Sequence, residues 1–345
     1  MKIALTRRRL LLSTGAAALA SAAWPVAAQA KLPKLTLAGP FAAVSNPLIR
    51  IADSGALADV AEQVEFVTWR TPDQLRALTI EGKADFLAMP SNVAANLFNR
   101  GVPLRLLNIS VWGIQYVLTR DAGVKTLADL RGKELLMPFR GDMPDITFQT
   151  LAAKLGVNIG QGEQDVRLRY VATPLDAMQM LLTRRADHAL LAEPAVSVGL
   201  LKSRALPVSV IAPDLYRGID IQQEWGRAFG REPRIPMAGI AVMGKHLGNA
   251  ALLARFEQAY EQAMQWCKSD SAACGQAVAR RIDMLTPEGV AESIAHSQLQ
   301  VVPAAQAKSE LEFFFEQLHA RQPGLIGGKL PAAEFYGASA AQPAA

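Results

Sequence analysis

The residues that could do chemistry are few and scattered in this chain of 345 residues. Its four histidines, His188, His246, His296 and His319, lack the spacing of metal ligands or of partners of a nucleophile. A Gly-x-Ser-x-Gly elbow is absent from the sequence, and two cysteines without a nearby histidine supply too few ligands for a metal. We therefore expect no catalytic residue, no metal site and no cofactor, and the sequence does not predict an enzyme.

Polar and aromatic side chains gather instead in five loops between predicted strands and helices. In an open α/β sheet the ligand lies at the carboxyl ends of the strands, where helix N-termini point unpaired N–H groups inward. The loops are residues 39–46, 90–92, 110–113, 140–145 and 193–194. We predict ligand contacts from these loops, and an aromatic wall from Trp69 after its own strand: Ser45, Asn46, Trp69, Ser91, Asn92, Trp112, Arg140, Gly141, Asp142, Asp145 and Glu193.

Each of these side chains also has an alternative role that the sequence leaves open. The serine and asparagine residues of the first two loops could simply cap helices. Trp112 could belong to the core instead of offering a flat surface to a ligand. Arg140 could pair with Asp142 or Asp145 in a solvated loop, or it could hold a carboxylate or sulfonate in a bidentate fork. The residue types therefore favour a binding site without proving one.

The acidic side chains bear on the charge of the ligand. A simple oxyanion pocket offers helix N-termini and hydrogen-bond donors, whereas Asp142, Asp145 and Glu193 would repel an anion if they face the site. A zwitterion or an amine-bearing heterocycle fits this mixture better, with Arg140 for an acceptor end and the carboxylates for donors. Nitrate or an alkyl sulfonate is the alternative if the acids only cap helices.

Strands alternating with helices must position these loops. The predicted strands are residues 34–38, 64–67, 86–89, 104–109, 115–118, 134–137, 167–171, 189–192 and 240–243. Residues 208–211 are expected to lead the chain back, and helical patterns dominate from residue 250 to about 317. The alternation predicts an α/β fold. The chain is longer than the usual size of a domain with one hydrophobic core, so we expect two lobes.

Residues 1–30 have the pattern of a cleavable export signal. A basic start is followed by an apolar, alanine-rich stretch and by small residues that predict cleavage after Ala30. Residues 6–11 resemble a twin-arginine signal, although Leu10 stands where that pattern prefers phenylalanine, and ordinary secretion is the alternative. Because no cysteine lies at the junction, we expect no lipid anchor and a periplasmic location.

The charge of the chain excludes one class of function. Residues 31–345 carry 32 Lys and Arg against 31 Asp and Glu, and no basic run occurs among them. Nucleic-acid binding needs clustered cations that release phosphate counterions. We therefore expect no nucleic-acid partner.

The two cysteines, Cys267 and Cys274, are seven positions apart across a polar cluster that is typical of a helix end followed by a new N-cap. In an oxidising compartment they could form a local disulfide. Two buried free thiols are the alternative.

Six short motifs, each at a turn between a helix and a strand, follow one another along the chain. They are Gly82-Lys83-Ala84-Asp85-Phe86, Gly101-Val102-Pro103-Leu104, the Leu127 to Lys133 element followed by Met137-Pro138, Pro174-Leu175-Asp176-Ala177-Met178, Arg185-Ala186-Asp187-His188-Ala189 and Ala192-Glu193-Pro194-Ala195. This ordered set resembles the solute-binding proteins of ABC importers, in particular the nitrate, sulfonate and taurine group, which includes relatives that bind thiamine-pyrimidine precursors. It spans most of residues 32–200.

The resemblance implies a type II periplasmic binding protein with two α/β lobes, each a mixed sheet flanked by helices, joined by two hinge crossings. We place lobe 1 in residues 31–118 plus 212–337, lobe 2 in residues 119–211 and a disordered tail in residues 338–345. The implied function is capture of a small solute in the cleft of a monomer and delivery to a permease in the inner membrane. The alternative is a periplasmic ligand sensor, or an accessory protein of a redox enzyme system, that uses the same fold without transport.

Overall fold

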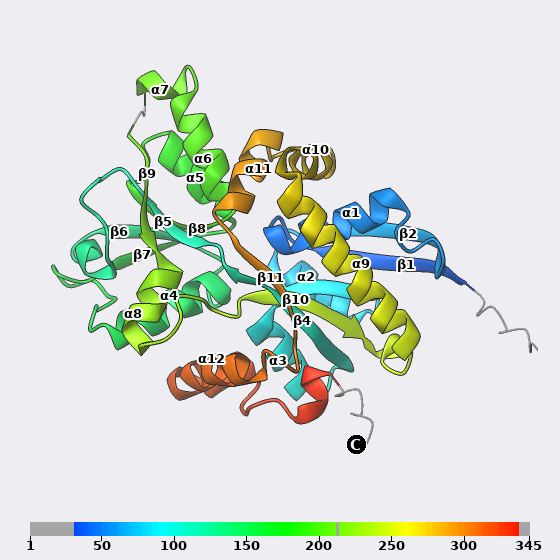
Figure 1. Ribbon diagram of the computed structural model, residues 1–345. Helices are drawn as coiled ribbons and strands as arrows, with labels where there is room; N and C mark the ends of the chain where they lie inside the picture. The colour runs from blue at the N-terminus through cyan, green and yellow to red at the C-terminus, as the bar shows by residue number, and fades with distance from the viewer. Residues whose placement is uncertain (1–30, 212–213, 338–345) are drawn as a thin grey trace, which may run out of the picture.

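A computed structural model describes residues 31–211 and 214–337, which form two α/β lobes side by side (Figure 1). The predicted export signal and the predicted disordered tail lie outside the described residues. Within the described ranges, every helix is too short or too polar to cross a membrane.

The first lobe is built on a six-stranded mixed sheet with the strand order β11-β4-β10-β3-β1-β2. Strands β1, β2 and β3 are parallel, whereas β10 runs antiparallel to both β3 and β4, and β11 runs antiparallel to β4. Its strands are β1 (Leu32–Gly39), β2 (Ala61–Thr68), β3 (Phe86–Pro90), β4 (Leu104–Gly113), β10 (Ala238–Met243) and β11 (Gln298–Pro303). Its helices are α1 (Asn46–Ser54), α2 (Pro72–Ile80), α3 (Ser91–Asn99), α9 (Ala250–Ser269), α10 (Ser271–Arg281), α11 (Pro287–Ala295) and α12 (Lys308–Arg321), with short 3₁₀ turns η1 (Ala43–Ser45), η3 (Gly244–His246), η4 (Pro323–Ile326) and η5 (Ala333–Tyr336).

The second lobe is built on a five-stranded sheet with the order β7-β6-β8-β5-β9. Strands β6, β7 and β8 are parallel, and β5 is antiparallel to β8. Its strands are β5 (Gln115–Thr119), β6 (Glu134–Pro138), β7 (Arg167–Val171), β8 (His188–Ala192) and β9 (Tyr216–Asp220). Its helices are α4 (Met143–Lys154), α5 (Pro174–Leu182), α6 (Ala195–Arg204), α7 (Val208–Ile211) and α8 (Ile221–Phe229), with the 3₁₀ turn η2 (Leu127–Leu130). Both lobes therefore present parallel strands whose carboxyl ends face the same cleft.

Three helices begin at a threonine–proline pair. Thr71, Thr173 and Thr286 each accept a hydrogen bond from the backbone N–H three residues later, at the starts of α2, α5 and α11. The proline that follows stands at a position whose N–H would have no partner in the helix, so its fixed φ angle favours the helix at no cost in hydrogen bonding. Two of these starts, at α2 and α5, bring their prolines to the cleft.

Backbone contacts in the first sheet depend on two particular residues. The buried carboxylate of Asp85 accepts a hydrogen bond from the Thr36 backbone N–H at 2.7 Å and lies 2.8 Å from His246 Nε2, so it ties β1 and η3 to the start of β3. Gly239 lies where a Cβ atom would stand 1.7 Å from the backbone oxygen of Asn108. Only glycine lets β10 approach β4 this closely.

The chain crosses between the lobes twice, as expected from the resemblance. It crosses at Ile114, between β4 and β5, and returns through residues 230–237, between α8 and β10. Because β5, β9 and α8 all pack in the second lobe, the first crossing lies four residues before the predicted boundary at 118, and the second begins 18 residues after the predicted boundary at 212.

Three segments differ from the pattern predicted along the chain. Residues 110–113, expected as a loop, continue β4, because their side chains are buried and pair with β11. Residues 208–211 form helix α7 and do not lead the chain back; the return follows β9 and α8. Strand β11 lies within the region expected to be helical.

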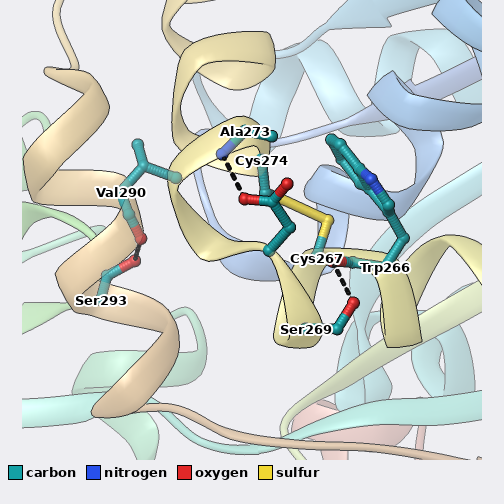
Figure 2. The surroundings of a disulfide bond; sticks show 8 residues. Trp266, Cys267, Ser269, Ala273, Cys274, Val290 and Ser293 are labelled. Carbon is teal, nitrogen blue, oxygen red and sulfur yellow. Dashed lines mark hydrogen bonds between the residues drawn. A yellow bond between two sulfur atoms is a disulfide. The ribbon is translucent and has the colours of Figure 1, made fainter.

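A disulfide joins Cys267 near the end of α9 to Cys274 in α10, with the two Cα atoms 5.0 Å apart. Figure 2 shows the bond at the corner between the two helices, where the Asp270 carboxylate accepts a hydrogen bond from the Ala273 N–H and caps α10. Helix α10 packs on α11, which carries Val290 and packs in turn on α6 of the second lobe. The corner therefore positions a helix that touches both lobes.

Candidate ligand-binding cleft

A cleft of about 340 Å³ lies between the two lobes. Its volume is in the range of small-molecule sites in proteins. Residues from both lobes and from both crossings line it, at the carboxyl ends of parallel strands β1, β2, β3, β6, β7 and β8. The first lobe and the crossings contribute Pro40, Phe41, Ala42, Val44, Trp69, Arg70, Pro72, Leu75, Met89, Pro90, Ile114, Met237, Ala238, Met284 and Leu285, and the second lobe contributes Gln115, Phe139, Asp142, Met143, Pro144, Thr173, Pro174, Leu175, Asp176, Ala192 and Ala195.

Most of this lining is apolar. Three aromatic side chains and four methionines surround the space, together with five prolines, four of which stand at the start of a helix. Methionine side chains are flexible and polarizable, and they adapt to the shape of an apolar ligand. The three aromatic residues are Phe41, Trp69 and Phe139, and the four methionines are Met89, Met143, Met237 and Met284.

The charged lining residues include a buried carboxylate on the second lobe. Asp142, at the N-cap of α4, is 7% exposed. Arg76 of α2, on the first lobe, donates a hydrogen bond to this carboxylate at 3.3 Å and also pairs with the exposed Asp73. Burial raises the pKa of Asp142, and the Arg76 guanidinium acts in the opposite direction. An ion pair therefore links the lobes at the edge of the cleft.

The floor of the cleft carries a buried amide at the first crossing. Gln115 is 2% exposed, and its backbone N–H and C=O form reciprocal hydrogen bonds with the side chain of Gln222 at 3.0 and 3.2 Å. The side-chain Oε1 atom of Gln115 has no hydrogen-bond partner. A buried amide oxygen without a partner is costly, so a Gln115 side chain that turns toward the cleft would gain a partner from a ligand.

Two of the eleven predicted contact residues line the cleft, Trp69 and Asp142. The Trp69 indole N–H donates to the backbone oxygen of Ala88 at 3.2 Å, which fixes the ring beside β3. The other nine lie outside the lining, so ligand contact by them stays a prediction.

The serine and asparagine residues near α1 and α3 are buried beside the cleft. The Ser45 hydroxyl donates to the Pro40 oxygen at 2.7 Å, and the Ser91 hydroxyl donates to the Pro236 oxygen at 2.5 Å, so neither side chain caps its helix. Asn46 is buried in the first turn of α1, and Asn92 is buried in α3 with its Oδ1 atom unpartnered. The two serine hydroxyls therefore hold the backbone next to the cleft wall.

Trp112 is a core side chain of β4. It is 2% exposed, and its indole N–H donates to the backbone oxygen of Gln300 at 2.9 Å. The Arg234 guanidinium lies 4.7 Å from the centre of its ring.

The loop before α4 forms a hydrogen-bonded network next to the cleft. The Asp145 carboxylate is 1% exposed and accepts hydrogen bonds from the Gly141 N–H at 2.8 Å and from the Tyr170 hydroxyl at 3.3 Å. The Arg140 guanidinium lies over the Tyr170 ring, 4.8 Å from its centre. Gly141 has a φ of 77°, which favours glycine. Of the acids in this loop, the network uses Asp145 and leaves Asp142 to face the cleft.

Glu193 is fully buried directly behind the lining residues Ala192 and Ala195. It forms an ion pair with Arg217 of β9 at 2.6 Å and accepts hydrogen bonds from the N–H and hydroxyl of Ser197. Burial raises the pKa of Glu193 to about 7, although Arg217 and Ser197 lower it. Sequence reasoning missed Arg217, because β9 itself was not predicted.

Most of the cleft lining was not predicted. Phe41 lies inside a loop that was predicted, but only the polar residues of that loop were chosen. Gln115 interrupts an apolar strand next to the crossing, and this polar position was the available signal. Phe139, with a φ of 56°, and the methionines carried no recognisable signal.

The chain has the two-lobe periplasmic binding protein fold, with two mixed sheets flanked by helices, and the predicted fold is confirmed. Among solved structures, an ABC transporter protein from Parabacteroides distasonis is 19% identical, with a TM-score of 0.71, over 88% of this chain and 98% of that chain. The alkanesulfonate-binding protein SsuA from Xanthomonas axonopodis pv. citri, bound to MOPS, is 16% identical, with a TM-score of 0.62, over 88% of this chain and 96% of that chain. The periplasmic nitrate-binding protein NrtA from Synechocystis PCC 6803 is 14% identical, with a TM-score of 0.63, over 88% of this chain and 83% of that chain. No family model and no curated protein sequence matches the chain.

Proposed function

We propose that this protein is the periplasmic substrate-binding component of an ABC importer. It captures a small polar solute in the cleft between the lobes and delivers it to a permease in the inner membrane. The observation that carries the proposal is a cleft of about 340 Å³ enclosed by residues of both lobes and both crossings. A ligand that contacts both lobes favours the closed form by the difference in its affinity for the two forms.

The similar solved structures support this role. The names of two of them describe proteins that bind alkanesulfonate or nitrate, and a third is named an ABC transporter. For this chain the candidate solutes are a sulfonate, a nitrate-like anion, a zwitterion and an amine-bearing heterocycle. Trp69 and Asp142, which line the cleft, are the proposed direct contacts, and ligand contact by the nine other predicted residues stays a prediction.

The proposal includes export. Residues 1–30 act as a signal of twin-arginine type that is cleaved after Ala30, and the mature chain works as a monomer in the periplasm. Binding requires no cofactor and no catalysis.

The proposal is tested on the mature chain, residues 31–345, purified from the periplasm. Native mass spectrometry is expected to reveal a bound small molecule, and small-angle scattering before and after its removal is expected to show the lobes opening. A ligand at 100 times its dissociation constant adds about 2.7 kcal/mol to the free energy of unfolding, which raises the melting temperature measurably.

Transport is tested with a candidate ABC permease and its ATPase, reconstituted in liposomes. ATP hydrolysis that rises only with the loaded protein supports import. Ligand binding and closure without any effect on ATP hydrolysis would instead favour a sensor or an accessory protein.

A further inference from the structure

Three of the helix starts that face the cleft are poorly suited to an anion. Helices α2, α4 and α5 each begin with a proline in the first turn, which removes a backbone donor. Each also carries an acid in that turn, Asp73, Asp145 or Asp176, and α4 has Asp142 at its N-cap as well. The positive end of each helix dipole is therefore already matched by a carboxylate of this chain.

Four side-chain donors around the cleft are also engaged within the protein. The Ser45 and Ser91 hydroxyls donate to backbone oxygens, and the Trp69 indole N–H does the same. The Thr173 hydroxyl, on the lining itself, donates to the Asp176 carboxylate at 2.7 Å. These four donors are therefore not free to hold an oxyanion.

The charges that remain on the lining favour a cation. Arg70 is exposed, and its guanidinium lies 5.6 Å from the centre of the Phe41 ring. The lining thus carries one guanidinium, that of Arg70, and two carboxylates, those of Asp142 and Asp176. Asp142 is the buried one, and Arg76 contacts only one of its oxygens, at 3.3 Å.

A buried amide adds one polar group to the lining. Gln115 is more than nine-tenths buried, lines the cleft, and its Oε1 atom has no partner. Because an amide can turn to offer either its oxygen or its N–H₂ group, this side chain accommodates a donor or an acceptor of the ligand. Since the rest of the lining is aromatic, methionine, leucine and proline, the body of the ligand has to be apolar to be bound there.

We propose that the cleft binds a mostly apolar amine, whose protonated nitrogen faces the carboxylate of Asp142 and whose hydrocarbon or aromatic body contacts the methionine and aromatic wall. This inference rests on the proposed role in import, and among the candidate solutes it retains the amine-bearing class while replacing a polar body with an apolar one. The same lining disfavours nitrate and sulfonates, because each would place a negative charge near two carboxylates.

The experiment compares two probes that share a ring but carry opposite charges. Isothermal titration of the mature chain, freed of any bound molecule by unfolding and refolding, uses 2-phenylethylamine and benzenesulfonate at pH 7, with nitrate and taurine as small polar probes. We expect 2-phenylethylamine to bind at least tenfold more tightly than benzenesulfonate, nitrate or taurine.

Matched variants assign the binding to the proposed groups. Asp142→Asn is expected to weaken the binding of 2-phenylethylamine at least tenfold, which is about 1.4 kcal/mol. The control is Asp73→Asn, which alters the other partner of Arg76 outside the lining and is expected to change this affinity by less than twofold. Met284→Gln, on the lining and 45% exposed, is expected to weaken binding, whereas Leu155→Gln, 37% exposed and away from the cleft, does not.

The outcomes separate this inference from the proposed function. If benzenesulfonate, nitrate or taurine binds more tightly than 2-phenylethylamine, or if Asp142→Asn and Asp73→Asn have equal effects, the inference of an amine ligand is wrong. The proposed function as a solute-binding protein is not affected by these outcomes. Absence of amine binding also overturns the inference of an amine ligand, while a co-purified molecule and lobe closure would still support the proposed function. A protein that is empty, does not close and binds no probe contradicts both.

Discussion

Burial of Glu193 predicts an unusual dependence of stability on pH. The pKa of this carboxyl rises from an ordinary value of 4.5 to about 7 in the folded protein, because burial outweighs the Arg217 guanidinium and the two donors of Ser197. Between these two values the unfolded chain has lost the proton and the folded chain still holds it. Unfolding is therefore increasingly favoured as pH rises through this window, and the stabilisation present below pH 4.5 is lost by about pH 7.

The size of the effect follows from the same two values. Each pKa unit corresponds to about 1.4 kcal/mol, so the Glu193 carboxyl contributes about 3 kcal/mol less to the free energy of unfolding at pH 8 than at pH 4. Glu193→Gln removes the titration, because an amide does not ionise. We expect the stability of the wild type relative to this variant to fall by about 3 kcal/mol across the window.

The assay is urea unfolding followed by circular dichroism at half-unit steps from pH 4 to 8, on the mature wild type and on Glu193→Gln. Arg217→Leu serves as a second variant: because the guanidinium lowers the pKa of Glu193, its removal extends the loss of stability above pH 7. An infrared carbonyl band of a protonated carboxyl at pH 6, absent from Glu193→Gln, would report the same proton directly. The reasoning would be refuted if the difference in free energy of unfolding between wild type and Glu193→Gln stayed constant with pH, or if the wild type became more stable relative to the variant as pH rises. Either result would show that the ion pair with Arg217 keeps the carboxylate charged.

Three further predictions concern the framework that holds the cleft. Replacing Cys267 and Cys274 with serine is expected to lower the free energy of unfolding by about 2 kcal/mol, because a short closed loop is released in the unfolded chain, and a melting curve with and without reductant checks this. Asp85→Asn is expected to cost about 2 kcal/mol in urea unfolding with no change in ligand affinity, since Asp85 precedes β3 and the cleft lies at the other end of that strand; altered affinity would contradict this placement. Gly239→Ala is expected to give little soluble protein on expression, because its Cβ would overlap a backbone oxygen of β4; normal yield and melting temperature would contradict it.

The fold could be predicted from the sequence because its signals are local. Helix entries such as Asn46-Pro47 and Thr71-Pro72 lie where α1 and α2 begin, and apolar runs such as residues 86–89 became strands at the centre of a sheet. Strands β9 and β11 were missed because each is partly exposed and carries polar residues, so their sequences lack an apolar run. Their strand structure depends on pairing with β5 and β4, which is information that lies far away in the chain.

The site was harder to predict, because lining a cleft depends on which way a side chain points. The loops at the carboxyl ends of the strands were placed correctly, yet reasoning from residue type chose polar side chains that the protein uses internally. Asp145 holds the loop before α4, and Ser45 holds the loop before α1. The wall is made instead by residues such as Met143 and Leu175, which are indistinguishable in sequence from core residues. Only tertiary contacts separate the two groups.

The disulfide corner has a consequence for the order in which this protein is made. Cys267 and Cys274 are both fully buried once α9 and α10 are docked, so an oxidant reaches their sulfurs only while the corner is open. A chain secreted unfolded would be oxidised before the helices pack, and the covalent bond would then guide the docking of α11 and of the Met284 and Leu285 segment that closes one side of the cleft. A chain exported already folded, as the twin-arginine route requires, would cross the membrane with both thiols reduced, and the corner would have to open again outside. The disulfide therefore forms before the helices pack if the chain is secreted unfolded, and after folding if the chain is exported by the twin-arginine route.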